Sequence, residues 1–213
     1  MKIRKSVLFT LIVTSFLPLL VTALLYGRLP QRIPMHWNIN GTIRYDPKIT
    51  IWLIASLSFI MTSFFLILPK IDPKKQNYEK FGGAYQGFIV VMQLLMLVLT
   101  GIILSESLNP GHISVSFTVV VAVGLLFAFL GNIMPKVKSN FFIGVRTPWT
   151  ISDPDVWFKT NRLAGYLFFF SGLLICVSAF LFSDRVLFLV LLVLVGISSI
   201  IPILMSYLWF RNK

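Results

Sequence analysis

Long apolar stretches alternate with short polar stretches along the whole chain. Each apolar stretch is about 20 residues long, which is the length at which a helix crosses the roughly 30 Å hydrocarbon core of a bilayer. The pattern predicts an all-α polytopic membrane protein with six transmembrane helices, at residues 6–27, 49–68, 84–104, 113–133, 163–182 and 186–207. The third stretch is the weakest of the six, because it contains Gln86 and Gln93.

The composition supports this class of protein. The chain of 213 residues is 57% hydrophobic and 12% charged, whereas soluble domains contain about 45–50% apolar and about 25% charged residues. This excess of apolar residues excludes an ordinary soluble enzyme, and it also excludes a disordered chain, which would be poor in these side chains.

The net charge of +12 invites an interpretation as a nucleic-acid-binding protein. The positions of the basic residues provide a simpler explanation. Fourteen of the nineteen Lys and Arg residues lie at the two chain ends and in the loops 69–83 and 134–162. These segments share one side of the membrane in a six-helix topology. Since cytoplasmic loops carry the excess of Lys and Arg, we expect both termini in the cytoplasm and no direct binding of nucleic acid.

The apolar stretches lack the residues that membrane chemistry requires. None of the six contains Asp, Glu, Lys, Arg or His, although pumps and proton-coupled carriers need ionisable groups within the membrane. Cys176 is the single cysteine, His36 and His112 are isolated, and no serine-nucleophile motif occurs. We therefore expect no catalytic residue, no metal and no cofactor. Interaction is the favoured function, and a small transporter or channel without intramembrane ionisable residues is the alternative.

The first outer loop has the pattern of a β-hairpin. Residues 35–39 alternate apolar and polar side chains, as a strand does, and Asn40-Gly41 favours a type I′ turn into residues 42–45. Two interpretations stay open: a structural cap anchored by interfacial aromatic residues, or a surface that faces a ligand. The candidate ligand residues are Pro34, His36, Trp37, Asn38 and Gly41.

The loop at residues 134–162 contains more specific chemistry than a tether needs. Ser152 and Asp155 form a Ser-x-x-Asp start that predicts a helix capped by Ser152 and continuing into the fifth span. Trp157 and Asn161, four residues apart, share one face of that helix. Arg146 either braces the loop, against span-end carbonyls and Asn132, or presents a cation to a partner or lipid phosphate. In the alternative interpretation the loop has no specific function: its tryptophans lie at the membrane interface, and its Lys and Arg residues only set the topology.

These loops resemble the SdpI family of bacterial immunity proteins. The outer segment is similar to the module that precedes the family signature, although Arg44 stands where an acidic residue is common and Asp46 follows two positions later. The resemblance implies two parts, an N-terminal module at 1–83 and a four-helix membrane domain at 84–213. The residues that match the signature in the inner loop are Asn132, Gly144, Arg146, Thr147, Pro148, Trp149, Thr150, Trp157, Asn161 and Arg162.

The family resemblance also carries functional expectations. It implies a multi-pass protein of the plasma membrane of a Gram-positive bacterium, which protects the cell from a secreted peptide toxin at the outer face. The best-known member also acts as a sensor that holds a small winged-helix repressor at the inner face. The partners implied are therefore the toxin, membrane lipids and such a repressor.

The charge distribution makes a testable prediction about topology. A cysteine introduced at Asn40 should react with a membrane-impermeant thiol reagent in intact cells, whereas a cysteine at Ser139 should react only after permeabilisation, because the loops with excess Lys and Arg stay in the cytoplasm. Labelling is measured by gel shift with Cys176 replaced by Ala. Labelling of the Ser139→Cys variant from outside would invert the topology.

Overall fold

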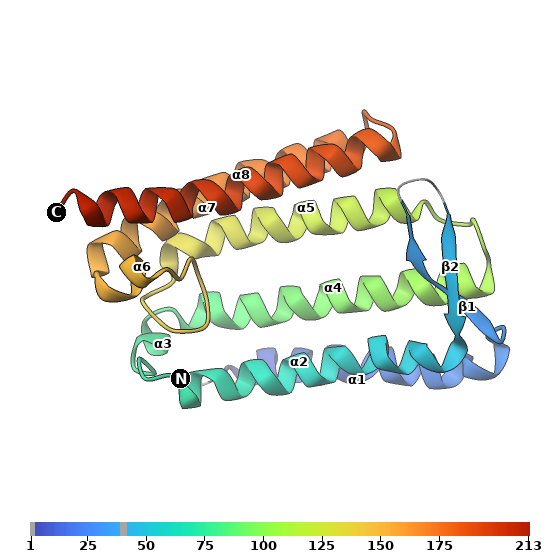
Figure 1. Ribbon diagram of the computed structural model, residues 1–213. Coiled ribbons are helices and arrows are strands. Elements are labelled where there is room, and N and C mark those ends of the chain that lie inside the picture. Colours follow the sequence, from blue (N-terminus) through green and yellow to red (C-terminus); the bar gives the residue numbers. More distant parts are fainter. Residues whose placement is uncertain (1–2, 39–41) are drawn as a thin grey trace.

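The computed structural model describes residues 3–38 and 42–213 (Figure 1). Within these residues, six helices are long and apolar enough to cross a membrane, which confirms the predicted all-α membrane fold. They are α1 (Lys5–Leu25), α2 (Ile51–Ile71), α4 (Gly82–Leu108), α5 (Val115–Ile133), α7 (Pro154–Ser178) and α8 (Asp184–Arg211).

Shorter elements lie at the two ends of the bundle. The strands β1 (Arg32–Trp37) and β2 (Ile43–Pro47) lie at one end, which we call the hairpin end. The short helices α3 (Asn77–Lys80) and α6 (Pro148–Ser152) lie at the opposite end together with both ends of the chain (Figure 1). We call this the terminal end. Three 3₁₀ turns join the elements, at Tyr26–Arg28, Lys48–Thr50 and Met134–Lys136.

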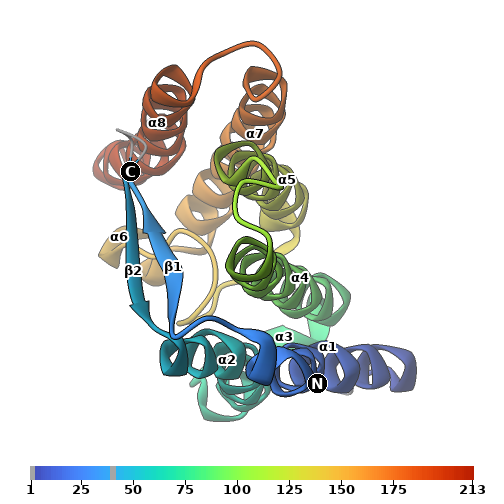
Figure 2. The same ribbon diagram turned by 90° about the vertical axis from the view of Figure 1, so that its right-hand side faces the viewer.

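The spanning helices form two packed groups. Helices α1, α2 and α4 contact one another, α7 contacts both α5 and α8, and the α4–α5 contact joins the two groups. Viewed from the hairpin end, the helices follow an open arc from α1 and α2 to α8, and the two strands run beside it (Figure 2). Helix α8 is therefore at the edge of the bundle.

Gln93, one of the two glutamines that weaken the third predicted span, is buried and bonded through both its oxygen and its nitrogen. Gln93 in α4 has no exposed surface, and its side-chain nitrogen donates to the Ser58 carbonyl oxygen of α2 at 3.0 Å. The Ser58 hydroxyl donates to the Gln93 side-chain oxygen. Polar side chains that pair across membrane helices add to helix association, so Gln93 holds α4 to α2.

Several helices extend beyond the predicted spans, and the extensions of α4 and α7 bear on the loops. Helix α4 continues to Leu108 and includes Glu106, a buried carboxylate that accepts the backbone N–H groups of Gly111 at 2.9 Å and Ile113 at 3.3 Å. Glu106 closes the turn into α5 by bonding backbone donors that have no helical partner. Helix α7 begins at Pro154, which confirms that the fifth span starts within the loop at 134–162.

Helices α5 and α7 approach so closely that glycine is required at the contact. A Cβ atom added to Gly172 would lie 2.5 Å from the carbonyl oxygen of Gly124, and one added to Gly131 would lie 2.6 Å from that of Gly165. Small residues at such positions let membrane helices pack backbone to backbone. Added side chains would force the two helices apart.

The substitution Gly172→Ala should therefore destabilise the protein by about 1–3 kcal/mol, the usual cost of overpacking. Thermal unfolding in detergent, followed by circular dichroism, measures the loss. The matched control is Gly196→Ala in α8, where an added Cβ meets no heavy atom within 4 Å. Equal melting temperatures for the two variants would show that the close approach is not a constraint.

Candidate functional site

The hairpin predicted in the first loop is present at the hairpin end. Strands β1 and β2 pair antiparallel, with His36 opposite Arg44 and Trp37 opposite Ile43. Asn38 closes the described part of the hairpin, since its backbone and side-chain nitrogens donate to the carbonyl oxygen and the hydroxyl of Thr42 at 2.9 and 2.8 Å. The predicted turn at Asn40-Gly41 lies outside the described residues. The first strand starts at Arg32, three residues before the predicted run.

Pro34 interrupts the ladder and is compensated by a side chain. It is buried opposite Tyr45, and proline has no N–H to donate. The Arg32 guanidinium donates instead to the Tyr45 carbonyl oxygen at 2.8 Å. The register shifts between Pro34 and His36, as in a β-bulge, which re-aims the side chains that follow.

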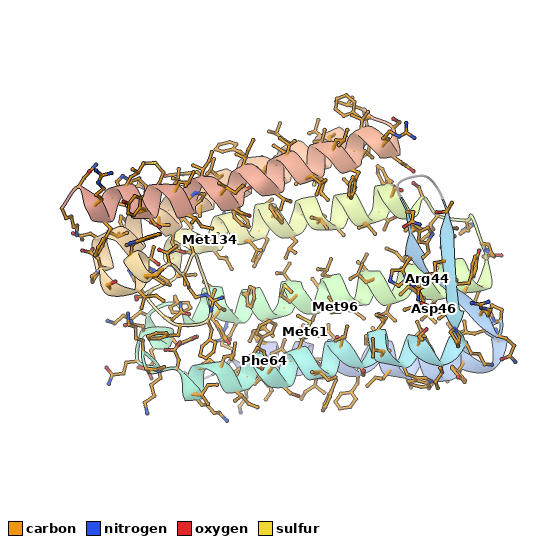
Figure 3. All side chains as sticks on the ribbon, in the orientation of Figure 1. Arg44, Asp46, Met61, Phe64, Met96 and Met134 are labelled. Atoms are coloured by element: carbon orange, nitrogen blue, oxygen red, sulfur yellow. The ribbon has the colours of Figure 1, made fainter. Side chains whose placement is uncertain are left out.

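One face of the hairpin is anchored and another is exposed and charged. Met35 and Trp37 pack against the buried cluster that includes Ile33 and Leu104. On the exposed side, the Asp46 carboxylate lies 3.3 Å from Nε of Arg44 and 3.7 Å from Nδ1 of His36, and Figure 3 labels Arg44 and Asp46 on β2. The Arg44 and His36 side chains are 71% and 61% exposed, so the polar groups of both are open to a partner.

At the terminal end, Asn140 folds the loop that follows α5. It has no exposed surface, and its side-chain oxygen accepts the backbone N–H groups of Phe142 and Ile143 at 2.8 and 2.7 Å. Its side-chain nitrogen donates to the carbonyl oxygens of Lys138 and Ile143, both at 2.9 Å. One amide side chain therefore replaces the backbone bonds that a loop lacks.

Asp72, just after α2, ties this loop to the first group of helices. The carboxylate is 2% exposed and accepts the Phe141 N–H and the Tyr78 hydroxyl, each at 2.9 Å. Burial, together with the hydrogen bond to Asp72, raises the pKa of Tyr78 well above its usual range. Tyr78 therefore stays a neutral donor, and its role here is structural.

Asn161 and Trp157 share one face of α7, as predicted, and hold the next part of the loop. The Val145 N–H donates to the Asn161 side-chain oxygen at 2.9 Å, and the Trp157 indole donates to the Val137 carbonyl oxygen at 2.9 Å. Gly144 has a φ of +102°, and a Cβ there would lie 2.5 Å from the Asn161 oxygen, so only glycine fits. Trp157 is 3% exposed, which excludes a place in an interfacial belt.

The loop then docks on α8 through α6. Thr147 caps α6, since its hydroxyl accepts the Thr150 N–H at 3.2 Å while its own N–H donates to the Thr150 hydroxyl at 2.8 Å. The Thr147 hydroxyl also lies 3.0 Å from that of Ser206 in α8. Trp149 packs on Tyr207 with ring centres 5.1 Å apart. Pro148 occupies the first turn of α6, where proline costs no hydrogen bond.

Of the two alternatives left open for Arg146, a brace against Asn132 is not what the structure shows. Arg146 is exposed, and its guanidinium donates to the Phe141 carbonyl oxygen at 2.6 Å, within the loop itself. Asn132 is exposed on α5 and accepts from the Lys136 ammonium at 3.0 Å. Arg162 is also exposed, beside the Tyr166 hydroxyl at 3.4 Å. Among the described residues, the Arg146 guanidinium bonds this one carbonyl, which leaves most of its donors available to a partner.

The predicted cap of α7 is also wrong by one residue. Asp153 caps the helix by accepting the Asp155 and Val156 N–H groups at 2.8 and 3.0 Å, while the Ser152 hydroxyl donates back to the Pro148 carbonyl oxygen. The cap shifts because Pro154 occupies the first helical position, which makes the extended Asp153 the residue before it. The hydrogen bond from Lys213, first, and those from Val156 and Asp155 lower the pKa of Asp153.

Two family models match the chain. The SdpI/YfhL protein family covers residues 136–206, and a domain of unknown function (DUF1648) covers residues 13–59. Immunity protein SdpI of Bacillus subtilis (strain 168) is 29% identical over 210 residues, which make up 98% of this chain and 97% of that protein. These matches confirm the resemblance of the chain to the SdpI family. No solved structure matches it significantly.

The SdpI/YfhL region contains the whole folded loop with α6, α7 and most of α8. Five of the ten signature residues form two sets in space. Gly144, Trp157 and Asn161 form one contact cluster, and Thr147 and Thr150 form the cap that meets α8. The side chains of Asn132, Arg146 and Arg162 are exposed and lie outside both sets.

Three residues of this SdpI/YfhL loop site could not be singled out from the sequence. Asp72, Tyr78 and Asn140 are polar residues in segments that look like solvated connections. The available signal was weak: Asp72 follows an apolar helix directly and precedes Pro73. Asparagine also favours local bonds to the backbone two and three residues on. Their burial depends on contacts across 62 to 69 residues of chain.

The ion pairs of Lys213 make a prediction about pH. Its ammonium lies 2.6 Å from Asp153 and 3.1 Å from Asp155, so Lys213→Met should raise the pKa of Asp153 towards the ordinary value of about 3.9. Because folding lowers this pKa, the stabilisation is present above about pH 3.9 and is lost as the pH falls through the lowered value. An NMR titration of ¹³Cγ-labelled aspartate measures the shift.

The control for this titration is Lys138→Met, which removes an exposed lysine of the same loop whose side chain has no acidic partner in the described structure. The pKa of Asp153 should be unchanged in that variant. An unchanged pKa in the Lys213→Met variant would contradict the link between the end of α8 and the start of α7.

Proposed function

We propose that this chain is a membrane immunity protein that protects its cell from a secreted peptide toxin. The observation that carries the proposal is the similarity to Immunity protein SdpI, which extends over 98% of this chain at 29% identity. A match of this extent includes both the hairpin and the terminal-end loop, so it is not confined to a generic membrane segment.

We infer that the hairpin end faces the outside of the cell and that both termini lie in the cytoplasm. The excess of Lys and Arg at the terminal end supports this orientation. It puts the exposed Arg44 and His36 at the face where a secreted peptide arrives. The exposed apolar residues Ile43 and Tyr45 precede and follow Arg44 along β2, so the hairpin offers polar and apolar groups to an amphipathic peptide with carboxylate groups.

The terminal-end loop supports a second, finer proposal: it presents a fixed surface to a cytoplasmic partner, a small winged-helix repressor. The loop is held by hydrogen bonds to the buried side chains of Asn140, Asn161 and Asp72. Arg146 and Phe141 of the same loop are exposed. A preorganised loop binds a partner at a lower entropic cost than a flexible one. The contacts of Thr147 and Trp149 with α8 provide a connection between a spanning helix and this surface.

A survival assay tests the immunity proposal. Deletion of the gene should sensitise the cell to the toxin, and the wild-type gene should restore survival. The double variant His36→Ala, Arg44→Ala should weaken toxin binding about tenfold, through lost charge-assisted hydrogen bonds, and lower survival at unchanged membrane abundance. The matched control is His112→Ala, an exposed histidine in the α4–α5 turn. Wild-type protection by the double variant would make the hairpin only a cap, and failure of the wild-type gene to protect would refute immunity.

A variant of Arg146, measured in the same survival assay together with a reporter gene, separates signalling from protection. Arg146→Lys keeps the charge but loses the planar guanidinium fork. If Arg146 contacts a repressor, this variant should protect normally and fail to induce a repressor-controlled reporter. Lost protection would instead assign Arg146 to bracing the loop, and full protection with full induction would remove it from the site.

A further inference from the structure

An open groove of about 470 Å³ lies between α7 and α8 towards the hairpin end, within the usual range for ligand sites of about 300–1,000 Å³. Its lining includes Leu174 and Val177 of α7, Leu181 in the turn after α7, and Leu189, Val190 and Val193 of α8. Ser178 is the polar residue of the lining, and its hydroxyl already donates to the Ile175 carbonyl oxygen at 2.7 Å. The groove therefore offers its occupant apolar contact alone.

The groove lies within the depth of one leaflet. Its lining on α7 runs from Leu174 to Ser178, which is about 6 Å at 1.5 Å per residue, and it continues through Leu181 and Phe182 in the turn that follows the helix. One leaflet contributes about 15 Å of the roughly 30 Å hydrocarbon core. A single acyl chain that enters from the hairpin-end leaflet would fill this length without crossing the midplane.

A cation lies in the first turn of α8, one turn before the residues of this helix that line the groove. Arg185 precedes Leu189 by four residues, so the two share a face of α8. Among the described residues, the Arg185 guanidinium has no hydrogen-bond or ion-pair partner and is exposed. The neighbouring Asp184 carboxylate is occupied by the Ser116 hydroxyl of α5 at 3.0 Å. The Ser183 side chain, at the N-cap of α8, accepts no hydrogen bond from the first turn of the helix. The backbone N–H groups of that turn therefore favour an anion.

We propose that this groove is a binding site for one anionic phospholipid. An acyl chain lies between α7 and α8, and the phosphate is bound by Arg185 and the first N–H groups of α8. The positive charge at one end of the site suits the phosphate of a phospholipid, and the apolar groove within one leaflet suits its acyl chain. A second copy of the chain fits less well, because a two-fold interface here would bring two Arg185 side chains together.

The site has a structural consequence for α8. An apolar segment of 18 residues in this helix is 17% buried, the lowest share among the six spans, and the protein contacts of α8 are mainly with α7. A lipid in the groove adds packing to the end of the α7–α8 pair that is opposite to α6. Its presence therefore stabilises the helix on which the terminal-end loop docks.

Native mass spectrometry of the full-length protein in detergent tests the proposal. The probes are palmitoyl-oleoyl phosphatidylglycerol, which is anionic, and palmitoyl-oleoyl phosphatidylethanolamine, which is zwitterionic. The wild type should retain one lipid and favour phosphatidylglycerol. Val193→Trp, which fills the groove, should lower the population of this adduct about tenfold, whereas Ile200→Trp should not. The two positions are matched, with Val193 58% and Ile200 57% exposed on α8.

Arg185→Gln tests the headgroup separately. It should abolish the preference for phosphatidylglycerol, while Arg211→Gln, an exposed arginine at the other end of α8, should leave it intact. Equal adduct populations for Val193→Trp and Ile200→Trp would overturn the groove as the lipid site. A preference that survives Arg185→Gln would overturn the phosphate assignment. A wild-type dimer that Val193→Trp dissociates would make the groove a protein interface instead.

Discussion

The backbone-to-backbone contact of α5 and α7 is the constraint on which the second half of the molecule depends. Gly124 and Gly131 of α5 meet Gly172 and Gly165 of α7 at distances that leave no room for a Cβ atom. Water does not drive helices together within a membrane, so close packing of small residues supplies much of the association. The contact fixes the start of α7 relative to the end of α5, and the terminal-end loop joins these two points.

The loop is stable because polar side chains replace secondary structure. Gly165 also accommodates Pro135, whose ring would lie 2.7 Å from an added Cβ, and this sets the exit direction of the chain after α5. From there Asn140 bonds its own loop, Asp72 reaches the loop from α2, and Asn161 reaches it from α7. Buried groups of this kind are costly when unpaired, so the three residues specify one conformation. Arg146 and Phe141 stand on a rigid support as a result.

Much of this architecture was predictable because it follows from periodicity. Segment length predicted six spans, alternation predicted the hairpin, and the four-residue spacing of Trp157 and Asn161 predicted their common face. The helix ends were less accessible. Ser152 and Asp153 both suit a cap, and Pro154 decides between them through its own preference for the first turn. Buried Asp72, Tyr78 and Asn140 could not be found, since their partners are distant in the chain. The exposure of Arg146 likewise depends on how the whole loop is folded.

Hydrogen exchange of the terminal-end loop, followed by mass spectrometry on the full-length protein in detergent, tests the central claim most directly. The backbone N–H groups of Phe142, Ile143 and Val145 donate to the side chains of Asn140 and Asn161. Amides held in this way exchange only when the local structure opens. We predict that these three exchange at least tenfold more slowly than in an unstructured peptide of the same sequence, and that Asn161→Ala accelerates the exchange of Val145. Exchange at the rate of the free peptide in the wild type would contradict the account of a preorganised surface.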